Sequence, residues 1–124
     1  MQRIAHISRA LSDPGRLRLL MAIAGDERCV CQLIDVLGLA PSTVSKHVSV
    51  LHDAGLVLRR KRGKWAYYRL PGRDAPLEVR RAIRWVRDAL ADDPEVLADA
   101  DRLEAQSCVE LETLTACYRH ASTS

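Results

Sequence analysis

The stretch that decides the fold is Pro41-Ser-Thr-Val-Ser-Lys-His-Val-Ser-Val-Leu-His-Asp-Ala-Gly, residues 41–55. Its apolar residues Val44, Val48 and Leu51 are spaced by four and three, which predicts a helix that begins at Pro41 and ends before Gly55. Short hydroxyl side chains, one lysine and one histidine fall on or beside the outward face: Ser42, Thr43, Ser45, Lys46, His47 and Ser49. Side chains this small let a helix backbone approach DNA closely, so we interpret the segment as a DNA recognition helix with its contacts between Ser42 and His47.

Three helical segments precede it. Residues 3–11 carry an apolar stripe that stops at Ser12-Asp13-Pro14, where Ser12 or Asp13 can cap a helix that starts at Pro14 and ends at Gly25. Asp26 is then expected to cap a third helix, which runs to Gly38. The expected inward positions are Ile4, Ile7, Ala10 and Leu11, then Leu17, Leu20, Met21 and Ala24, then Val30, Leu33, Ile34 and Leu37. The short, glycine-containing connection to the recognition helix is that of a helix-turn-helix.

A basic β-hairpin is predicted directly after the recognition helix. Its expected strands are residues 56–58 and 65–70, and residues 59–69 hold six cations and no acid. Trp65, Tyr67 and Tyr68 can anchor the hairpin to the core, while the cations lie along DNA phosphates. The candidate phosphate contacts are Arg60, Lys61, Arg62 and Lys64. We therefore expect a mainly α fold with a small β-hairpin (α+β), a dimeric winged helix-turn-helix that binds double-stranded DNA.

Length and charge fit this class. The 124 residues are enough for a single domain, expected to span 1–124. Residues 1–91 carry 17 basic and 8 acidic side chains, whereas residues 92–124 carry 2 and 8, so a basic body suited to a polyanion precedes an acidic tail. No apolar run reaches the roughly 18–20 residues of a membrane span, and the first residues lack the apolar core of a signal peptide. We expect a cytoplasmic protein without membrane contact.

Two more helices are predicted beyond the loop that contains Pro71-Gly72 and Pro76. The first is marked by Val79, Ile83, Val86 and Leu90. The second, an acidic helix, is marked by Leu97, Ala100, Leu103, Leu111, Leu114 and Tyr118. An apolar stripe on an acidic helix favours pairing with another helix. We expect the terminal helices, in residues 1–11 and 76–118, to form the dimer interface.

Four segments carry a more specific resemblance: Ala10-Leu-Ser-Asp-Pro-Gly-Arg-Leu-Arg-Leu-Leu, Arg28-Cys-Val-Cys-Gln-Leu, residues 41–57, and Gly63-Lys-Trp-Ala-Tyr-Tyr-Arg-Leu. Together they resemble the arsenic- and metal-responsive ArsR/SmtB repressors, in register over residues 9–70. The resemblance implies a homodimeric repressor without enzymatic activity. It also implies a palindromic operator, from which the protein is released when a metal or metalloid binds.

Within that family, Cys-Val-Cys resembles the arsenite and antimonite site, so the resemblance implies As(III) or Sb(III) as inducer, held by Cys29 and Cys31. With Asp26 as cap, Cys29 is expected in the first helical turn, where the helix dipole and Arg28 favour the thiolate. Residues i and i+2 point about 200° apart on an ideal helix, so both sulfurs can hold one ion only if that turn unwinds. Our hypothesis is that this distortion shifts the recognition helix and lowers operator affinity.

A third ligand is expected because arsenite prefers three thiolates. The closest relatives of the motif often have a cysteine three residues after Cys31, where this chain has Ile34. Cys108 and Cys117 remain, but nine residues of helix separate them by roughly 13 Å, so at most one completes a given site. We favour Cys108, from the same or the partner subunit, over Cys117 or a small exogenous thiol.

Three alternatives stay open. The family's thiolate route to Cd(II) or Pb(II) sensing uses further N-terminal cysteines, and residues 1–28 contain none. A repressor that senses oxidants through Cys29 or Cys31, with or without Cys108, fits the same thiols. A small thiol reductase is the least favoured alternative, because no anion-binding loop and no acid or base partner adjoins the cysteine pair.

Overall fold

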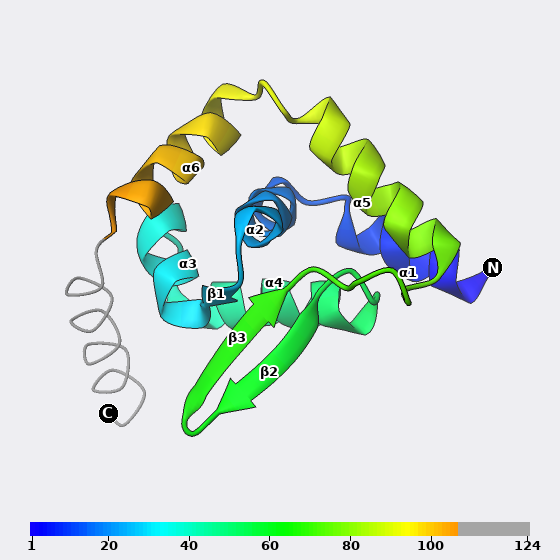
Figure 1. The fold of residues 1–124 in the computed structure, drawn as a ribbon, viewed down its shortest axis with the longest axis horizontal. Helices are drawn as coiled ribbons and strands as arrows, with labels where there is room; N and C mark the ends of the chain where they lie inside the picture. Colours follow the sequence, from blue (N-terminus) through cyan, green and yellow to red (C-terminus); the bar gives the residue numbers. More distant parts are fainter. Residues whose placement is uncertain (107–124) are drawn as a thin grey trace.

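The computed structural model describes residues 1–106, which form six helices and a small antiparallel sheet whose hairpin projects from the helices (Figure 1). In chain order the elements are α1 (Gln2–Ala10), α2 (Pro14–Gly25), β1 (Arg28–Cys29), α3 (Val30–Leu37), α4 (Pro41–Asp53), β2 (Leu58–Arg62), β3 (Trp65–Arg69), α5 (Leu77–Ala89) and α6 (Pro94–Ala105). The helix pair α3–α4 followed by the hairpin β2–β3 is a winged helix-turn-helix, so the expected fold class is confirmed.

Helix α2 is the centre of the fold and packs against α3, α4, α5, α6 and β3. It begins where the sequence predicts, because the Asp13 carboxylate accepts a hydrogen bond from the Arg16 backbone N–H at 3.1 Å and Pro14 occupies the first turn. The inward stripe expected for this helix is partly wrong, because Leu20 is buried but Leu17, Met21 and Ala24 are only half-buried. Leu19 and Ile23 are fully buried instead, since neighbouring elements pack around α2 on several sides.

The helix-turn-helix follows the predicted pattern. Val44, Val48 and Leu51 of α4 are buried, which fixes the opposite face of this helix outward. Gly38 ends α3 with φ +67°, a left-handed conformation that glycine adopts without strain, and this turn redirects the chain into α4.

The sheet has the strand order β1-β3-β2, and its first strand is absent from the sequence prediction. Arg28 pairs with Tyr68 and Cys29 with Tyr67, so residues 28–29 are extended. The third helix therefore begins at Val30 with Cys29 as its N-cap, and the expectation that Asp26 caps it is wrong. Pairing with β3 explains the difference, because it draws residues 28–29 out of the helix.

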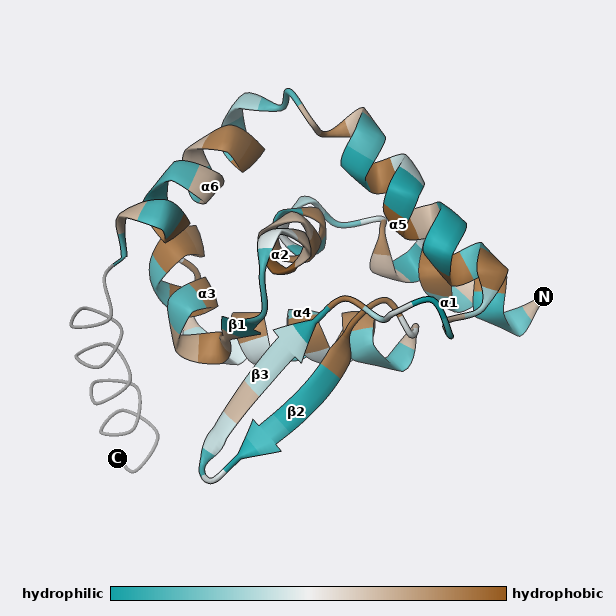
Figure 2. Ribbon diagram, viewed as in Figure 1, coloured by the Kyte–Doolittle hydropathy of each residue, from teal (hydrophilic) through white to brown (hydrophobic). Residues whose placement is uncertain are grey.

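The hairpin strands also differ from the prediction. β2 consists of Leu58–Arg62, so the basic residues themselves form the strand expected at residues 56–58. Leu56 and Val57 are instead fully buried between α4 and β2. In Figure 2, β2 is mostly hydrophilic and β3 is paler, which matches a wing with one edge in solvent.

The acidic helix α6 turns a carboxylate inward. Asp99 has a side-chain exposure of 3%, and it accepts two hydrogen bonds from Arg18 at 2.9 Å and one from Arg102 at 2.6 Å. Leu103 is buried as expected, but Leu97 and Ala100 are exposed, so part of the predicted stripe is wrong. The helix ends at Ala105 with an extended Gln106, and the expected continuation to residue 118, with Cys108 and Cys117, lies outside the described residues.

Candidate nucleic-acid interface and thiol site

Helix α4 presents the predicted hydroxyl-rich face. Ser42, Ser45, Lys46 and Ser49 are exposed and Thr43 is half-buried. Pro41 opens the helix, so its first backbone N–H groups have no intrahelical partner and are available to an anion. This face can accept a DNA groove without rearrangement of the helix.

His47 has a different environment from the other residues of this face. Its Nε2 lies 3.5 Å from Asp13 Oδ2, and its Nδ1 lies 3.4 Å from Arg16 Nη1. Gly15 permits this approach, because a Cβ at that position would lie 3.1 Å from the imidazole Nε2. His47 therefore packs the recognition helix against the start of α2, which the sequence pattern did not predict.

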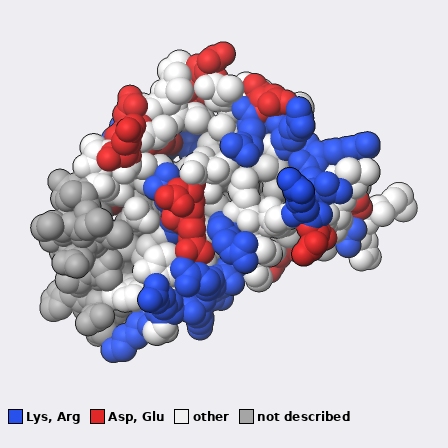
Figure 3. All heavy atoms as spheres, viewed as in Figure 1, with Lys and Arg blue, Asp and Glu red and all other residues white. Residues whose placement is uncertain are grey.

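The wing carries exposed cations on β2 and at the tip. Lys61, Arg62 and Lys64 are exposed, and among residues 1–106 none of them lies within ion-pair distance of a carboxylate. Gly63 forms the tip with φ +63°, a left-handed conformation suited to a tight hairpin turn. Figure 3 shows the basic side chains gathered over the hairpin, with a second group over α5.

Arg60 is the wing cation that does have a partner. Its Nη2 donates to Glu27 Oε1 at 2.6 Å and its Nε donates to Glu27 Oε2 at 3.2 Å. Its guanidinium also lies 5.3 Å from the centroid of the Tyr67 ring. The hydrogen bonds from Arg60 hold the pKa of Glu27 below its usual range. Glu27 is a residue of the site that the sequence analysis missed.

The two cysteines of the motif lie together. Cys29 and Cys31 are 2% and 3% exposed, and Cys31 Sγ donates to Cys29 Sγ at 2.9 Å. The expectation that the sulfurs point apart is wrong, because Cys29 is an extended N-cap residue and only Cys31 belongs to the helix. Both sulfurs can therefore bond to one atom without unwinding a helical turn.

The protonation of the pair also differs from the prediction. The hydrogen bond with Cys31 and the burial of the site raise the pKa of the Cys29 thiol above its usual value. The expectation that the helix dipole and Arg28 favour the Cys29 thiolate is therefore wrong. The buried environment of the pair instead favours the neutral thiol of Cys29.

A chain of amides connects this pair to the end of α6. Gln32 Oε1 accepts from the Cys29 backbone N–H at 3.0 Å, and Gln32 Nε2 lies 3.5 Å from Gln106 Oε1. Gln106 Nε2 in turn donates to Asp35 at 3.0 Å. Gln106 is thus linked through the Gln32 side chain to the backbone of Cys29. Within residues 1–106, no further histidine, cysteine or carboxylate joins the pair to make a three-ligand group.

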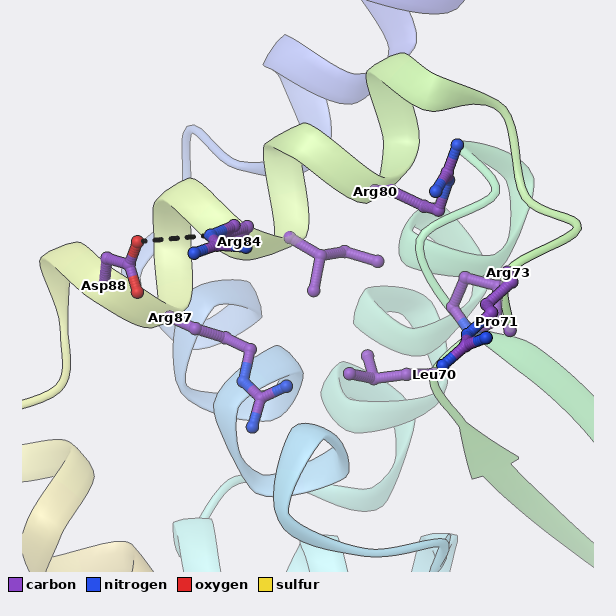
Figure 4. A pocket seen from close by; sticks show the side chains of 9 residues that line it. Leu70, Pro71, Arg73, Arg80, Arg84, Arg87 and Asp88 are labelled. Carbon is purple, nitrogen blue, oxygen red and sulfur yellow. Dashed lines mark ion pairs between the residues drawn. The ribbon is translucent and has the colours of Figure 1, made fainter.

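A second basic surface lies along α5. An open hollow of about 640 Å³ has Leu70, Pro71 and Ile83 among its lining residues (Figure 4). Four guanidinium groups line it as well: Arg73, Arg80, Arg84 and Arg87. The one carboxylate in the lining, Asp88, lies 3.9 Å from Arg84 in an exposed pair. The hollow extends the positive surface of the molecule.

Comparison with known proteins decides the family. The profile of the family described as "Bacterial regulatory protein, arsR family" matches residues 13–58. The HTH-type transcriptional regulator CmtR of Mycobacterium bovis is 35% identical over 109 residues, which cover 87% of this chain and 89% of that protein. The chain belongs to the ArsR family. The resemblance inferred from the sequence is thereby confirmed.

The chain is also similar to a regulator whose name refers to arsenic resistance. The arsenic resistance transcriptional regulator ArsR1 of Pseudomonas putida is 36% identical over 84 residues, or 67% of this chain and 65% of that protein. The match spans between 52% and 76% of the length of the first curated relatives. The solution structure of a homodimeric winged helix-turn-helix domain from Mycobacterium bovis, a possible ArsR-family regulator, superposes with a TM-score of 0.61 at 28% identity. It covers 75% of this chain and 82% of that one. Over the described residues of this ArsR-family chain, no helix is long and apolar enough to cross a membrane.

Proposed function

We propose that this ArsR-family protein is a homodimeric transcriptional repressor that binds a palindromic operator and is released when As(III) or Sb(III) binds to Cys29 and Cys31. The observation that carries the proposal is the contact of the two buried sulfurs at 2.9 Å, because it lets one soft atom bond to both. The family and the name of the Pseudomonas putida relative support the metalloid.

The raised pKa of the Cys29 thiol favours arsenite over a divalent cation. Arsenite near neutral pH is the uncharged acid As(OH)₃, and each thiol that condenses with it forms one As–S bond and releases one water, without electron transfer. Cd(II) or Pb(II) must instead displace a proton from each thiol, which a raised pKa opposes. The same reaction with three thiols gives As(SR)₃ and three waters.

Cys108 is our proposed third ligand. Two residues of chain span at most about 7 Å, and Gln106 is hydrogen-bonded to Gln32, the residue that follows Cys31. Cys108 follows Gln106 by two residues in the sequence, and for this reason we favour it over Cys117. Cys117 and a small exogenous thiol are the competing donors.

The DNA contacts are assigned to the exposed face of α4 and to the wing. On α4 these are Ser42, Thr43, Ser45 and Lys46, and on the wing they are Lys61, Arg62 and Lys64, together with Arg60 when it leaves Glu27. His47 stays a predicted DNA contact from the sequence, but its position between Asp13 and Arg16 favours a role in docking α4 against α2. Non-enzymatic action and a cytoplasmic location belong to the same proposal.

The test of the function is fluorescence anisotropy on a palindromic duplex that the protein itself has selected from a random pool. Titration with As(III), Sb(III), Cd(II), Pb(II) and Zn(II) identifies the inducer, and we expect release by the first two. Release by Cd(II) or Pb(II) alone would replace arsenite with a divalent cation as the signal.

A second candidate function rests on the same contact of sulfurs. Two thiols this close can form a disulfide with a peroxide, in which the O–O bond breaks, one S–S bond forms and two waters leave. Release of the duplex by hydrogen peroxide and not by arsenite selects this redox reading. Catalytic turnover of a disulfide by the pair would select the thiol reductase.

Arg62→Ala tests the wing. Arg62 is exposed on β2 and has no carboxylate partner among residues 1–106, so it is free to pair with a phosphate. We expect the variant to weaken operator binding and to lower the slope of log K against log salt by about one unit per subunit contact. Arg73→Ala, an exposed arginine in the loop before α5, is the matched control and should keep the slope. An unchanged slope for Arg62→Ala removes this contact from the proposal.

Trp85→Glu tests the dimer. We propose that the terminal helices, within residues 1–11 and 76–118, form the interface, and that α1 and α5 contribute to it. Trp85 and Leu77 of α5 and Ile4 of α1 are large, exposed apolar residues, and the two helices are in contact. We expect a dimer at micromolar concentration in sedimentation and a monomer for Trp85→Glu. Leu58→Glu, an exposed apolar residue outside the interface, should remain dimeric. A monomeric wild type contradicts the assignment.

A further inference from the structure

The thiol site and the wing share one row of the sheet. Cys29 of β1 lies opposite Tyr67 of β3, and Tyr67 lies opposite Arg60 of β2. Residues directly opposite each other on neighbouring strands point to the same face, which agrees with the position of the Arg60 guanidinium over the Tyr67 ring. A change at Cys29 therefore has a direct cross-strand path to a wing cation, without passing through α4.

Glu27, the residue before β1, reaches Arg60 across β3 from a position next to this row. It precedes Cys29 by two residues, the spacing that returns a strand side chain to the same face. Its carboxylate holds Arg60 by two hydrogen bonds, at 2.6 and 3.2 Å, across the sheet. Such a bidentate pair fixes the orientation of a guanidinium as well as its position. The three other candidate wing cations, Lys61, Arg62 and Lys64, have no such restraint within residues 1–106.

We propose that Glu27 is a positioning residue that transmits the state of the thiol pair to the wing by holding Arg60. The inference rests on the proposed function. The sulfurs are in direct contact at 2.9 Å, so an atom that bonds to both must separate them and move the backbone of β1. Glu27 is joined to β1 through Arg28, and its carboxylate moves with that strand. The guanidinium of Arg60 is then redirected relative to the DNA phosphates.

Glu27→Gln is the test, because glutamine keeps the shape and removes the charge. We expect As(III) to bind with an unchanged ultraviolet thiol–arsenic absorbance titration. The ratio of operator affinities without and with As(III), typically about 5- to 150-fold for an allosteric effector, should fall by about fivefold. Glu27→Asp should recover part of the ratio. Asp26→Asn is the matched control, since its carboxylate accepts from the Glu27 backbone N–H and an amide oxygen can do the same.

A double-variant cycle separates transmission from general stability. With Arg60→Gln already present, Glu27→Gln should not change the ratio further, because its partner is gone. The inference is overturned if the double variant has a lower ratio of operator affinities than Arg60→Gln alone. It is also overturned if Glu27→Gln keeps the wild-type ratio at saturating As(III).

A DNA-free measurement keeps this inference distinct from the proposed function. As(III) should shift the Arg60 Nε–H resonance in the spectrum of the ¹⁵N-labelled full chain, and the shift should be absent from Glu27→Gln. If As(III) shifts the Arg60 Nε–H resonance but does not release DNA, the proposed release by arsenite is wrong and the path from the thiols to Arg60 is retained. If DNA is released and Arg60 does not shift, the path fails and the function stands. Absence of As(III) binding to the wild type overturns both.

Discussion

Cys31→Ser leaves operator binding intact and abolishes its release by arsenite. Serine preserves the size of a buried side chain that is 3% exposed, so the fold and the DNA surface should persist. The hydroxyl cannot replace the thiol as a ligand for a soft atom, so the shared bond is lost. We expect a decrease of at least about 100-fold in apparent As(III) affinity, equivalent to roughly 2.7 kcal/mol. Anisotropy with increasing As(III) measures it, and Cys29→Ser should behave in the same way.

Two further serine variants locate the third ligand. Cys108→Ser should weaken the As(III) response while leaving two sulfurs in place, and Cys117→Ser is the matched control with the same chemical change nine residues further on. If Cys108→Ser responds normally to As(III) and Cys117→Ser responds weakly, then Cys117 and not Cys108 is the third ligand. If the Cys31→Ser variant still dissociates from the operator at the arsenite concentration that releases the wild type, the assignment of Cys31 as a ligand is wrong.

Asp99→Ala has the largest expected effect on stability. Arg18 is 16% exposed, and without Asp99 it loses two hydrogen bonds; its remaining ion-pair partner among residues 1–106 is Glu95, at 3.4 Å and largely exposed. Removal of one member of a buried ion pair typically costs about 3–5 kcal/mol. Chemical denaturation measures the change in the free energy of unfolding. If the alanine variant does not fold, Asp99→Asn can be measured instead, and it should lose less stability because it retains an acceptor. Asp101→Ala, at an exposed position, is the control and should have little effect. An unaffected Asp99→Ala contradicts the role of the pair.

The same pair gives the stability a pH dependence. Burial of Asp99 opposes its ionisation, but the hydrogen bonds from Arg18 and Arg102 outweigh it, so the pKa of Asp99 lies below its usual value. A lowered folded-state pKa means that the stabilising contribution is complete above about pH 4 to 5 and is lost as the pH falls through the folded-state pKa. Asp99→Asn should therefore converge with the wild type in acid.

The sequence predicts the helix-turn-helix well because its signals are local. Val44, Val48 and Leu51 repeat with the period of a helix, and Asp13-Pro14 and Gly38 act through their own backbone conformations. The wing is predicted from its charge and aromatic residues, but its register is not. Leu56 and Val57 have a strand-like composition, but their side chains are buried in the core and the pairing with β3 begins only at Leu58.

The thiol geometry could not be predicted from local signals. Residues 26–37 have a helical pattern, and only the distant β3 strand draws Arg28 and Cys29 into an extended conformation. The same long-range pairing brings Glu27 to Arg60, 33 residues away. His47 likewise looks like a groove residue until α2 places Asp13 and Arg16 beside it. In each case the partner lies on an element whose position the sequence pattern does not give.

The two-residue strand β1 has a consequence for how the sensor resets. A helical turn that melts on binding must nucleate again before the empty state returns, and nucleation is the costly step of helix formation. Here Cys29 is already extended, so both sulfurs can bond to one atom without melting a turn of α3. In the proposed arsenite response, we expect the return to the DNA-binding form to be governed by the exchange of sulfur–arsenic bonds with water and not by refolding of the protein.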